Sequence, residues 1–226
     1  MGPAAPVHHG ARAFGPRAAS LAGAALAAVT AGVAGLRRTR KPLHPRGVVT
    51  HGVLRREGAS TKTGVPWLDE PGVDDVLVRR SRAVGLPSSV PDIHGLAMRM
   101  PTATGSFDLL FASTGLGRLT RFLLTSSRSP WARPLTTLLP YRSPRGPVLL
   151  AAEHSSETQL ELWVASPWGP WSRFARLKLS PEIDMRAEAA VNFDPIANTT
   201  PGLENYDWVR RLRQPAYRTA RRSRRT

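Results

Sequence analysis

The stretch LAMRMPTATGSFDLLFA, residues 96–112, holds the pattern that decides the fold class. Two β-prone runs, Leu96–Met100 and Phe107–Ala112, flank the turn-forming segment Pro101–Gly105. The same alternation continues outward in both directions, with further β-prone runs at Gly47–Leu54, Val76–Val78, Val148–Ala152 and Gln159–Val164. Several short strands at this spacing favour an antiparallel sheet or barrel over a βαβ fold.

A few helices are expected around these strands. Residues 115–142 hold Leu, Arg and Phe at mixed spacing and predict a helix before a Pro-rich turn at 140–147. Helical spacing returns near Tyr206–Arg213. The predicted fold class is therefore α+β, an antiparallel β-barrel with a few peripheral helices.

Composition narrows the function classes. The 226-residue chain is long enough for one domain with a sizeable core, and it contains no cysteine. That absence excludes disulfides, thiolate zinc sites, iron–sulfur clusters and a cysteine nucleophile. The net charge of +16 comes mostly from arginine, which suits nucleic acid, anionic lipid or an anionic cofactor.

The N-terminal part differs from the rest of the chain. Residues 1–17 are rich in Gly, Pro, Ala and His and are expected to be disordered. Residues 18–36 carry no charge and are built from Ala and Gly; they predict a packed helix, a membrane anchor or a signal segment. Residues 37–226 form the predicted domain. We expect it to be cytoplasmic, either free or held at a membrane through 18–36.

Several common chemistries lack their sequence motifs. There is no Gly-rich phosphate loop, no His-Glu-x-x-His cluster and no Gly-x-Ser-x-Gly elbow. His154 is expected alone in a turn. The acidic pairs Asp69–Glu70 and Asp74–Asp75 flank Pro71–Gly72 and predict a surface turn. Generic motifs alone would indicate only a basic, β-rich globular domain.

Six segments together resemble the catalase superfamily, because they follow its motif order over residues 41–224. They read LHPRGVVTHG (43–52), VRRSRAVG (78–85), PDIHGLAMRM (91–100), GSFDLL (105–110), NFDPIANTTPGLE (192–204) and RQPAY (213–217). The resemblance implies a haem-binding β-barrel of catalase type. Some of the many arginines would then bind the two propionates of a haem held inside the fold.

The resemblance also implies a role for individual residues. His44 corresponds to the distal base, which takes a proton from peroxide and returns it to the other oxygen. Ser81 corresponds to the group that holds the far ring nitrogen of this histidine. Tyr217 corresponds to the axial iron ligand, and Arg213, one helical turn earlier, would stabilise its phenolate. Propionate binding is implied for Lys41, Arg79 and Arg224.

Each of these residues has a plainer interpretation as well. His44 is also compatible with a surface loop, Ser81 with a solvent-facing edge strand and Tyr217 with an ordinary interface tyrosine. The eight arginines between Arg210 and the C-terminus can form a solvated or nucleic-acid-binding tail.

Three departures from the family pattern shape the functional hypothesis. The chain is much shorter than a full catalase, so we expect the helical and later domains to be missing. Ala112 stands where catalases carry the distal asparagine, and the lost donor typically costs about 10²–10³ in rate. Arg80 replaces an apolar aromatic residue and predicts either a charge near the pocket or a solvent-facing side chain.

These departures favour a haem-dependent peroxidase or catalase-related enzyme over an efficient catalase. The expected substrates are hydrogen peroxide and, preferably, organic hydroperoxides, with an electron donor that the sequence does not identify. The alternatives are a non-catalytic haem binder and a basic structural or nucleic-acid-binding protein that has lost haem. A nucleic-acid partner is not favoured, and a monomer or dimer is expected.

Overall fold

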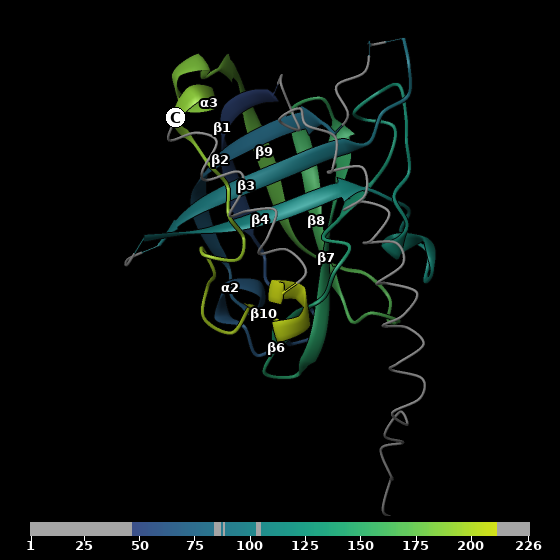
Figure 1. Cartoon of the computed structure of the whole chain (residues 1–226). Helices are drawn as coiled ribbons and strands as arrows, with labels where there is room; N and C mark the ends of the chain where they lie inside the picture. Colours follow the sequence, from purple (N-terminus) through teal and green to yellow (C-terminus); the bar gives the residue numbers. More distant parts are fainter. Residues whose placement is uncertain (1–46, 84–86, 88, 103–104, 212–226) are drawn as a thin grey trace, which may run out of the picture. The chain divides into compact units, whose positions relative to one another are not determined.

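Eight antiparallel strands close into a barrel in the computed structural model, which describes residues 47–83, 87, 89–102 and 105–211 (Figure 1). The order around the barrel is β7-β5-β4-β3-β2-β1-β9-β8, and pairing of β8 with β7 closes it. The strands are β1 (Gly47–Arg56), β2 (Gly72–Arg82), β3 (His94–Thr102), β4 (Gly105–Ser113), β5 (Leu135–Thr136), β7 (Gly146–Ser156), β8 (Gln159–Ala165) and β9 (Ser172–Ile183). The predicted fold class, an antiparallel barrel with few helices, is confirmed.

Smaller elements surround the barrel. Strand β6 (Tyr141–Ser143) pairs with β7, and β10 (Glu204–Asn205) pairs with β6. The helices are α2 (Pro66–Asp69), the 3-10 turn η1 (Thr120–Phe122), α3 (Met185–Ala190) and a helix over 207–211. The last of these confirms the helical spacing expected near Tyr206–Arg213 within its described part.

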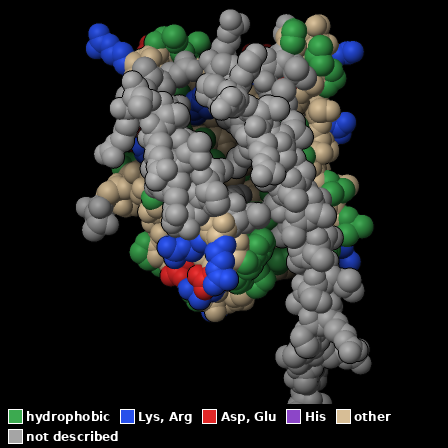
Figure 2. Space-filling view, in the orientation of Figure 1, with side chains coloured by type: hydrophobic (Ala, Val, Ile, Leu, Met, Phe, Trp, Pro, Cys, Tyr) green, Lys and Arg blue, Asp and Glu red, His purple; other side chains and the backbone are tan. Residues whose placement is uncertain are grey.

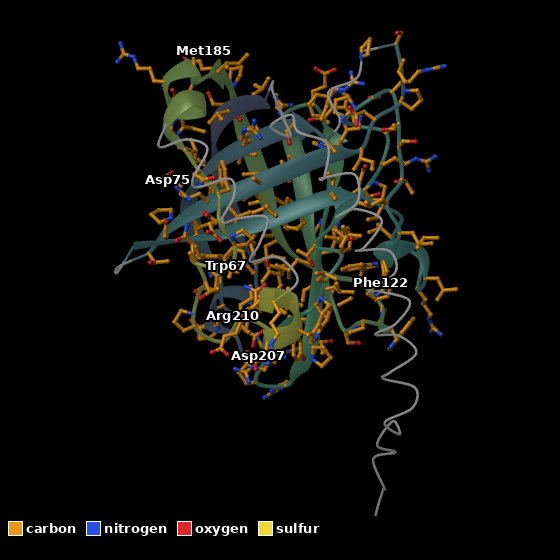
Figure 3. The ribbon with its side chains drawn as sticks, in the orientation of Figure 1. Trp67, Asp75, Phe122, Met185, Asp207 and Arg210 are labelled. Atoms are coloured by element: carbon orange, nitrogen blue, oxygen red, sulfur yellow. The ribbon has the colours of Figure 1, made fainter. Side chains whose placement is uncertain are left out.

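The core fills the barrel because alternate residues of each strand point inward. On β2, β3 and β4 the inward side chains include Val78, Met98 and Leu109, all essentially buried. At one end, Trp67 of α2 packs edge-on against the rings of Phe107 and Phe174, with centroids 4.9 and 5.5 Å away (Figure 3). Burying each such aromatic stabilises the fold by roughly 1.5–3 kcal/mol.

All six β-prone runs lie within observed strands, whereas the expected helix within 115–142 is wrong. That segment contains only η1 and the short strands β5 and β6 among its ordered elements. The physical reason is that the buried Arg121 side chain binds backbone carbonyls of two loops instead of lying on a helix surface.

Two expectations about polar residues are also corrected. Asp69 is buried rather than part of a surface turn, and its carboxylate accepts hydrogen bonds from the Thr63 N–H at 2.8 Å and the Gly64 N–H at 2.7 Å. His154 lies on β7, opposite Leu160 of β8, and not in a turn. Both residues therefore take part in the packing of the domain.

Candidate functional site

The outer face of β1–β4 places four small residues on one surface with four larger ones. Strand register aligns Gly47, Ser81, Gly95 and Ala112 across the four strands. One step along the strands, the register aligns Val49, Arg79, Ala97 and Leu110. These residues alternate with inward core residues, so they share the opposite face of the sheet. We call these eight residues the outer shelf.

Two glycines of the outer shelf make room for polar side chains that lie across them. A Cβ at Gly47 would come within 2.5 Å of the Arg79 guanidinium carbon. A Cβ at Gly95 would come within 3.0 Å of the Ser81 hydroxyl oxygen. Larger residues at these positions would displace Arg79 and crowd Ser81. The glycines thus let a cation and a hydroxyl lie close to the sheet.

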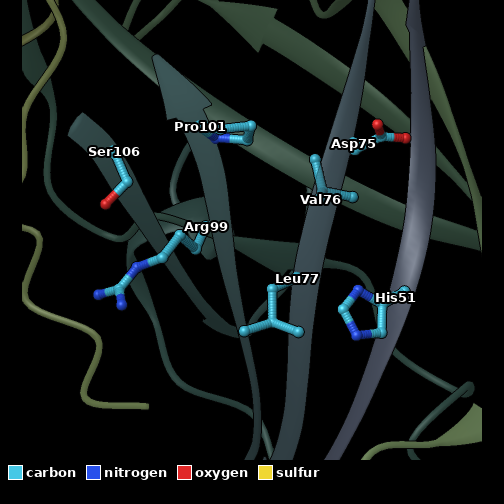
Figure 4. A pocket seen from close by; sticks show the side chains of 7 residues that line it. All are labelled: His51, Asp75, Val76, Leu77, Arg99, Pro101 and Ser106. Carbon is cyan, nitrogen blue, oxygen red and sulfur yellow. The ribbon is translucent and has the colours of Figure 1, made fainter. Parts of the chain in front are cut away.

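A groove continues the same face beyond the outer shelf. Figure 4 shows Arg99, Leu77 and His51 side by side on neighbouring strands, in the register that follows the shelf. The groove has a volume of about 220 Å³, and Pro101, Ser106, Asp75 and Val76 complete its lining. It is open to solvent, which suits a surface contact better than an enclosed reaction site.

A hydrogen bond between His51 and Asp184 lies at the exposed end of this groove. His51 Nε2 lies 3.0 Å from Asp184 Oδ2. Asp184 also caps α3 by accepting from the N–H groups of Ala187 and Arg186. The hydrogen bond from Ala187, followed by that from His51, lowers the pKa of the Asp184 carboxyl. This arrangement fixes the start of α3 against β1.

Asp108 fastens the connection after α3 to the sheet. Its fully buried carboxylate accepts hydrogen bonds from Arg99 Nε and Nη2, both at 2.7 Å. It also accepts from the Asp194 N–H at 2.7 Å and from Asn198 Nδ2 at 2.8 Å. The hydrogen bonds with Asp108 raise the pKa of Arg99. This cluster therefore holds segment 192–198, through which the chain reaches the helix over 207–211.

Arg80 points to the inside of the barrel, away from the outer shelf. Its guanidinium lies 4.8 Å from the ring centroid of Trp131, and the His154 ring lies edge-on to Trp131 at 4.7 Å. Burial lowers the pKa of Arg80. Burial first, and then the charge of Arg80, lowers the pKa of His154 to about 4. Arg80 thus neither adds a charge to the outer shelf nor simply faces solvent.

The structure brings together two of the predicted site residues and leaves five untested. Ser81 and Arg79 lie two residues apart on the outer shelf. The other predicted residues, His44, Lys41, Arg213, Tyr217 and Arg224, lie outside the described residues, as does segment 18–36. Ala112 lies on the outer shelf opposite Gly95.

Sequence reasoning missed the shelf and the Asp108 cluster as units. The signal for the shelf was the period-2 placement of Gly95 and Ala97 opposite Ala112 and Leu110.

In the described part of the chain, no group of three or more His, Asp or Glu side chains is arranged to hold a metal ion. Within that part, no helix has the length and apolarity needed to cross a bilayer.

Comparison with known proteins supports the fold assignment. Catalase A from Saccharomyces cerevisiae superposes with a TM-score of 0.59 at 14% identity, covering 85% of this chain and 63% of that one. A fungal catalase superposes with a TM-score of 0.55 at 13% identity, covering 78% and 58%. No protein-family model matches the sequence, and no curated protein matches it either.

These similarities establish that the domain has a catalase-like barrel fold. The chain spans about three-fifths of the length of the two catalases. The low sequence identity limits the finding to the fold, because one fold can carry unrelated functions.

Proposed function

We propose that this protein binds haem against the outer shelf and acts as a haem-dependent peroxidase or catalase-related enzyme. The observation that carries the proposal is the outer shelf of a catalase-like barrel, in which Gly95, Ala97 and Ala112 share one face with Arg79 and Ser81. A flat macrocycle requires a surface without protruding side chains. Gly95, Ala97 and Ala112 provide such a surface.

The residues around the shelf fit the chemistry of haem. Arg79 presents a guanidinium suited to a propionate carboxylate, and Lys41 and Arg224 are proposed to assist it. Tyr217 is proposed as the axial ligand, with Arg213 favouring its phenolate form by charge. A bound haem would supply the iron redox chemistry that peroxide reduction requires.

The protein side chains would then handle the protons. His44 is proposed to accept a proton from the peroxide at its imidazole and to return it to the departing oxygen. Ser81 is proposed to bond the other ring nitrogen of His44, which fixes the tautomer. The Ser81 hydroxyl lies on the outer shelf next to Gly95, where a Cβ would come within 3.0 Å of it.

The shelf also favours larger substrates over hydrogen peroxide. Ala112 has no donor for a peroxide oxygen, and Arg80 lies on the other side of the sheet. Turnover of hydrogen peroxide therefore lacks one positioned hydrogen bond, a loss of about 10²–10³ in rate. Organic hydroperoxides are the proposed substrate class, because the methyl group of Ala112 can contact the alkyl chain of such a substrate.

An absorption spectrum of protein purified from haem-supplemented cells tests this proposal. We expect a Soret band in the wild type, a weaker or shifted band in Tyr217→Phe and loss of the band in Ala97→Phe. Val73→Phe is the matched control, since Val73 lies further along the outer face of β2 and is 60% exposed. A wild-type protein without a Soret band would contradict the proposal.

Haem binding without turnover is the second candidate, and Ala112 is the observation that favours it. The two candidates differ in their response to peroxide. An enzyme forms an oxidised species that a reductant returns to the resting ferric spectrum, whereas a storage or sensing protein does not cycle. Stopped-flow spectra with cumene hydroperoxide and ascorbate distinguish them.

A further inference from the structure

Two loops form a compact lobe beside the ends of β4 and β8. They comprise residues 115–123, which include η1, and residues 166–171. Arg121 joins them: its side chain is buried and donates to the carbonyl oxygens of Gly117, Leu116, Ser166, Pro167 and Gly169 at 3.0–3.3 Å. The guanidinium also stacks on the Trp171 ring at 4.5 Å. We call these two loops the Trp168 lobe.

The Trp168 lobe presents apolar side chains to solvent. Leu119 is 69% exposed, Trp168 48% and Leu123 45%. Phe122, labelled in Figure 3, contacts Trp168, and the two ring centroids are 5.5 Å apart. Loop tips in soluble domains are ordinarily polar, so a group of large apolar residues on a fixed support indicates a binding surface.

The two loops of the lobe carry arginine and no carboxylate side chain. Residues 109–152 contain no Asp or Glu and six arginines, and residues 162–181 also contain no carboxylate side chain. Arg118 is exposed within the lobe. On the right-hand edge of the view in Figure 2, hydrophobic side chains lie among Lys and Arg side chains without visible acidic neighbours. The partner should therefore combine apolar character with negative charge.

We propose that the Trp168 lobe binds the surface of an anionic lipid bilayer. Trp and Leu enter the boundary between headgroups and acyl chains, and arginine remains beside the anionic headgroups. The rigid support matters because side chains that are already fixed lose little entropy on insertion. A second copy of this chain is a poorer partner, since the net charge of +16 makes two such surfaces repel.

The Trp168 lobe shares no residue with segment 18–36 or with the outer shelf. Its role is to place the barrel on the membrane with a defined side facing the lipid. Because affinity comes from both apolar burial and charge, binding should weaken with salt and with neutral lipid.

The test measures partition of the full chain onto vesicles by co-sedimentation. Vesicles contain phosphatidylcholine alone or an equimolar mixture with phosphatidylglycerol. We expect binding to the anionic vesicles and a loss of about tenfold in partition for each of Leu119→Ser and Trp168→Ser. Met185→Ser is the matched control, because Met185 is equally exposed (69%) but lies on α3, away from the lobe (Figure 3).

Three outcomes would overturn the proposal. The first is equal partition of the wild type and the double variant that combines Leu119→Ser with Trp168→Ser, whether both bind or neither does. The second is equal partition of the wild type onto neutral and anionic vesicles. The third is a wild-type dimer by light scattering that the double variant converts to monomer, which would assign the lobe to a second copy. Quenching by brominated lipid that is reduced in Trp168→Phe would support insertion of this side chain.

Discussion

Replacing Asp108 by Asn should release the 192–198 connection from the barrel. The Asp108 carboxylate is fully buried and accepts four hydrogen bonds, two from Arg99, one from the Asp194 N–H and one from Asn198. Asparagine has nearly the same shape, but its amide places donors where a carboxylate oxygen accepted bonds. The substitution also removes the negative charge that faces the Arg99 guanidinium.

The magnitude follows from these contacts. Removing one partner of a buried ion pair costs about 3–5 kcal/mol. The Arg99 side chain is 24% exposed and can regain some hydration, so we expect a loss near the lower end, ~3 kcal/mol. For a domain of this size each kcal/mol lowers Tm by about 2–4 °C, which gives a decrease of about 6–12 °C.

Urea unfolding and limited proteolysis provide the assay. We expect a lower urea midpoint for Asp108→Asn and faster cleavage within residues 192–198 than in the wild type. Asp75→Asn is the control, since Asp75 is an exposed carboxylate on the same face of the sheet. If both variants unfold at the same urea concentration, the Asp108 cluster does not hold the connection and the reasoning is refuted.

Three further predictions follow from other contacts. Arg121→Lys should destabilise the domain by about 2–4 kcal/mol in urea, because an ammonium cannot reach five carbonyl oxygens on two loops. An unchanged urea midpoint would contradict the role of Arg121 in joining the two loops. His154 has a folded-state pKa of about 4, below its unfolded value of 6.5, so stability is fully present above pH 6.5 and is lost as the pH falls towards 4. His154→Gln should flatten the dependence of Tm on pH over this window, and an equally steep profile in the variant would count against the buried neutral imidazole. Ala112→Asn should raise oxygen release from hydrogen peroxide by about 10²–10³ if the outer shelf holds haem, as measured by an oxygen electrode; no gain in a haem-loaded variant would show that the shelf does not position the peroxide.

The strands were predictable where turn-forming residues flank them, and β9 is the strand for which this prediction fails. Its sequence SRFARLKLSPEI carries three cations and a proline, so it lacks the apolar run used to recognise the other strands. The structure places Phe174, Leu177 and Leu179 in the core, and the register between β8 and β9 shifts at Arg173–Ala175. The bulge disrupts the alternation on which a sequence-based prediction depends.

The candidate site was predictable from the sequence only in part. The motif in β2 identified Arg79 and Ser81, and the structure places both on the outer shelf. The direction of Arg80 was also available from the sequence, because a residue between two outward-facing neighbours on a strand must face inward. The Asp108 cluster was not available, since it joins residues about 90 positions apart whose contact depends on the path of the chain after β9.

The composition of segment 109–152 has a consequence for how its surface charge responds to the environment. The segment contains no Asp, Glu, His or Lys, so its ionisable side chains are six arginines and Tyr141. Arginine stays protonated at every pH that cells reach, and a tyrosine ordinarily titrates near pH 10. Acidification or a mild rise in pH therefore leaves the charge of this region constant, and ionic strength becomes the variable that tunes its electrostatic attraction.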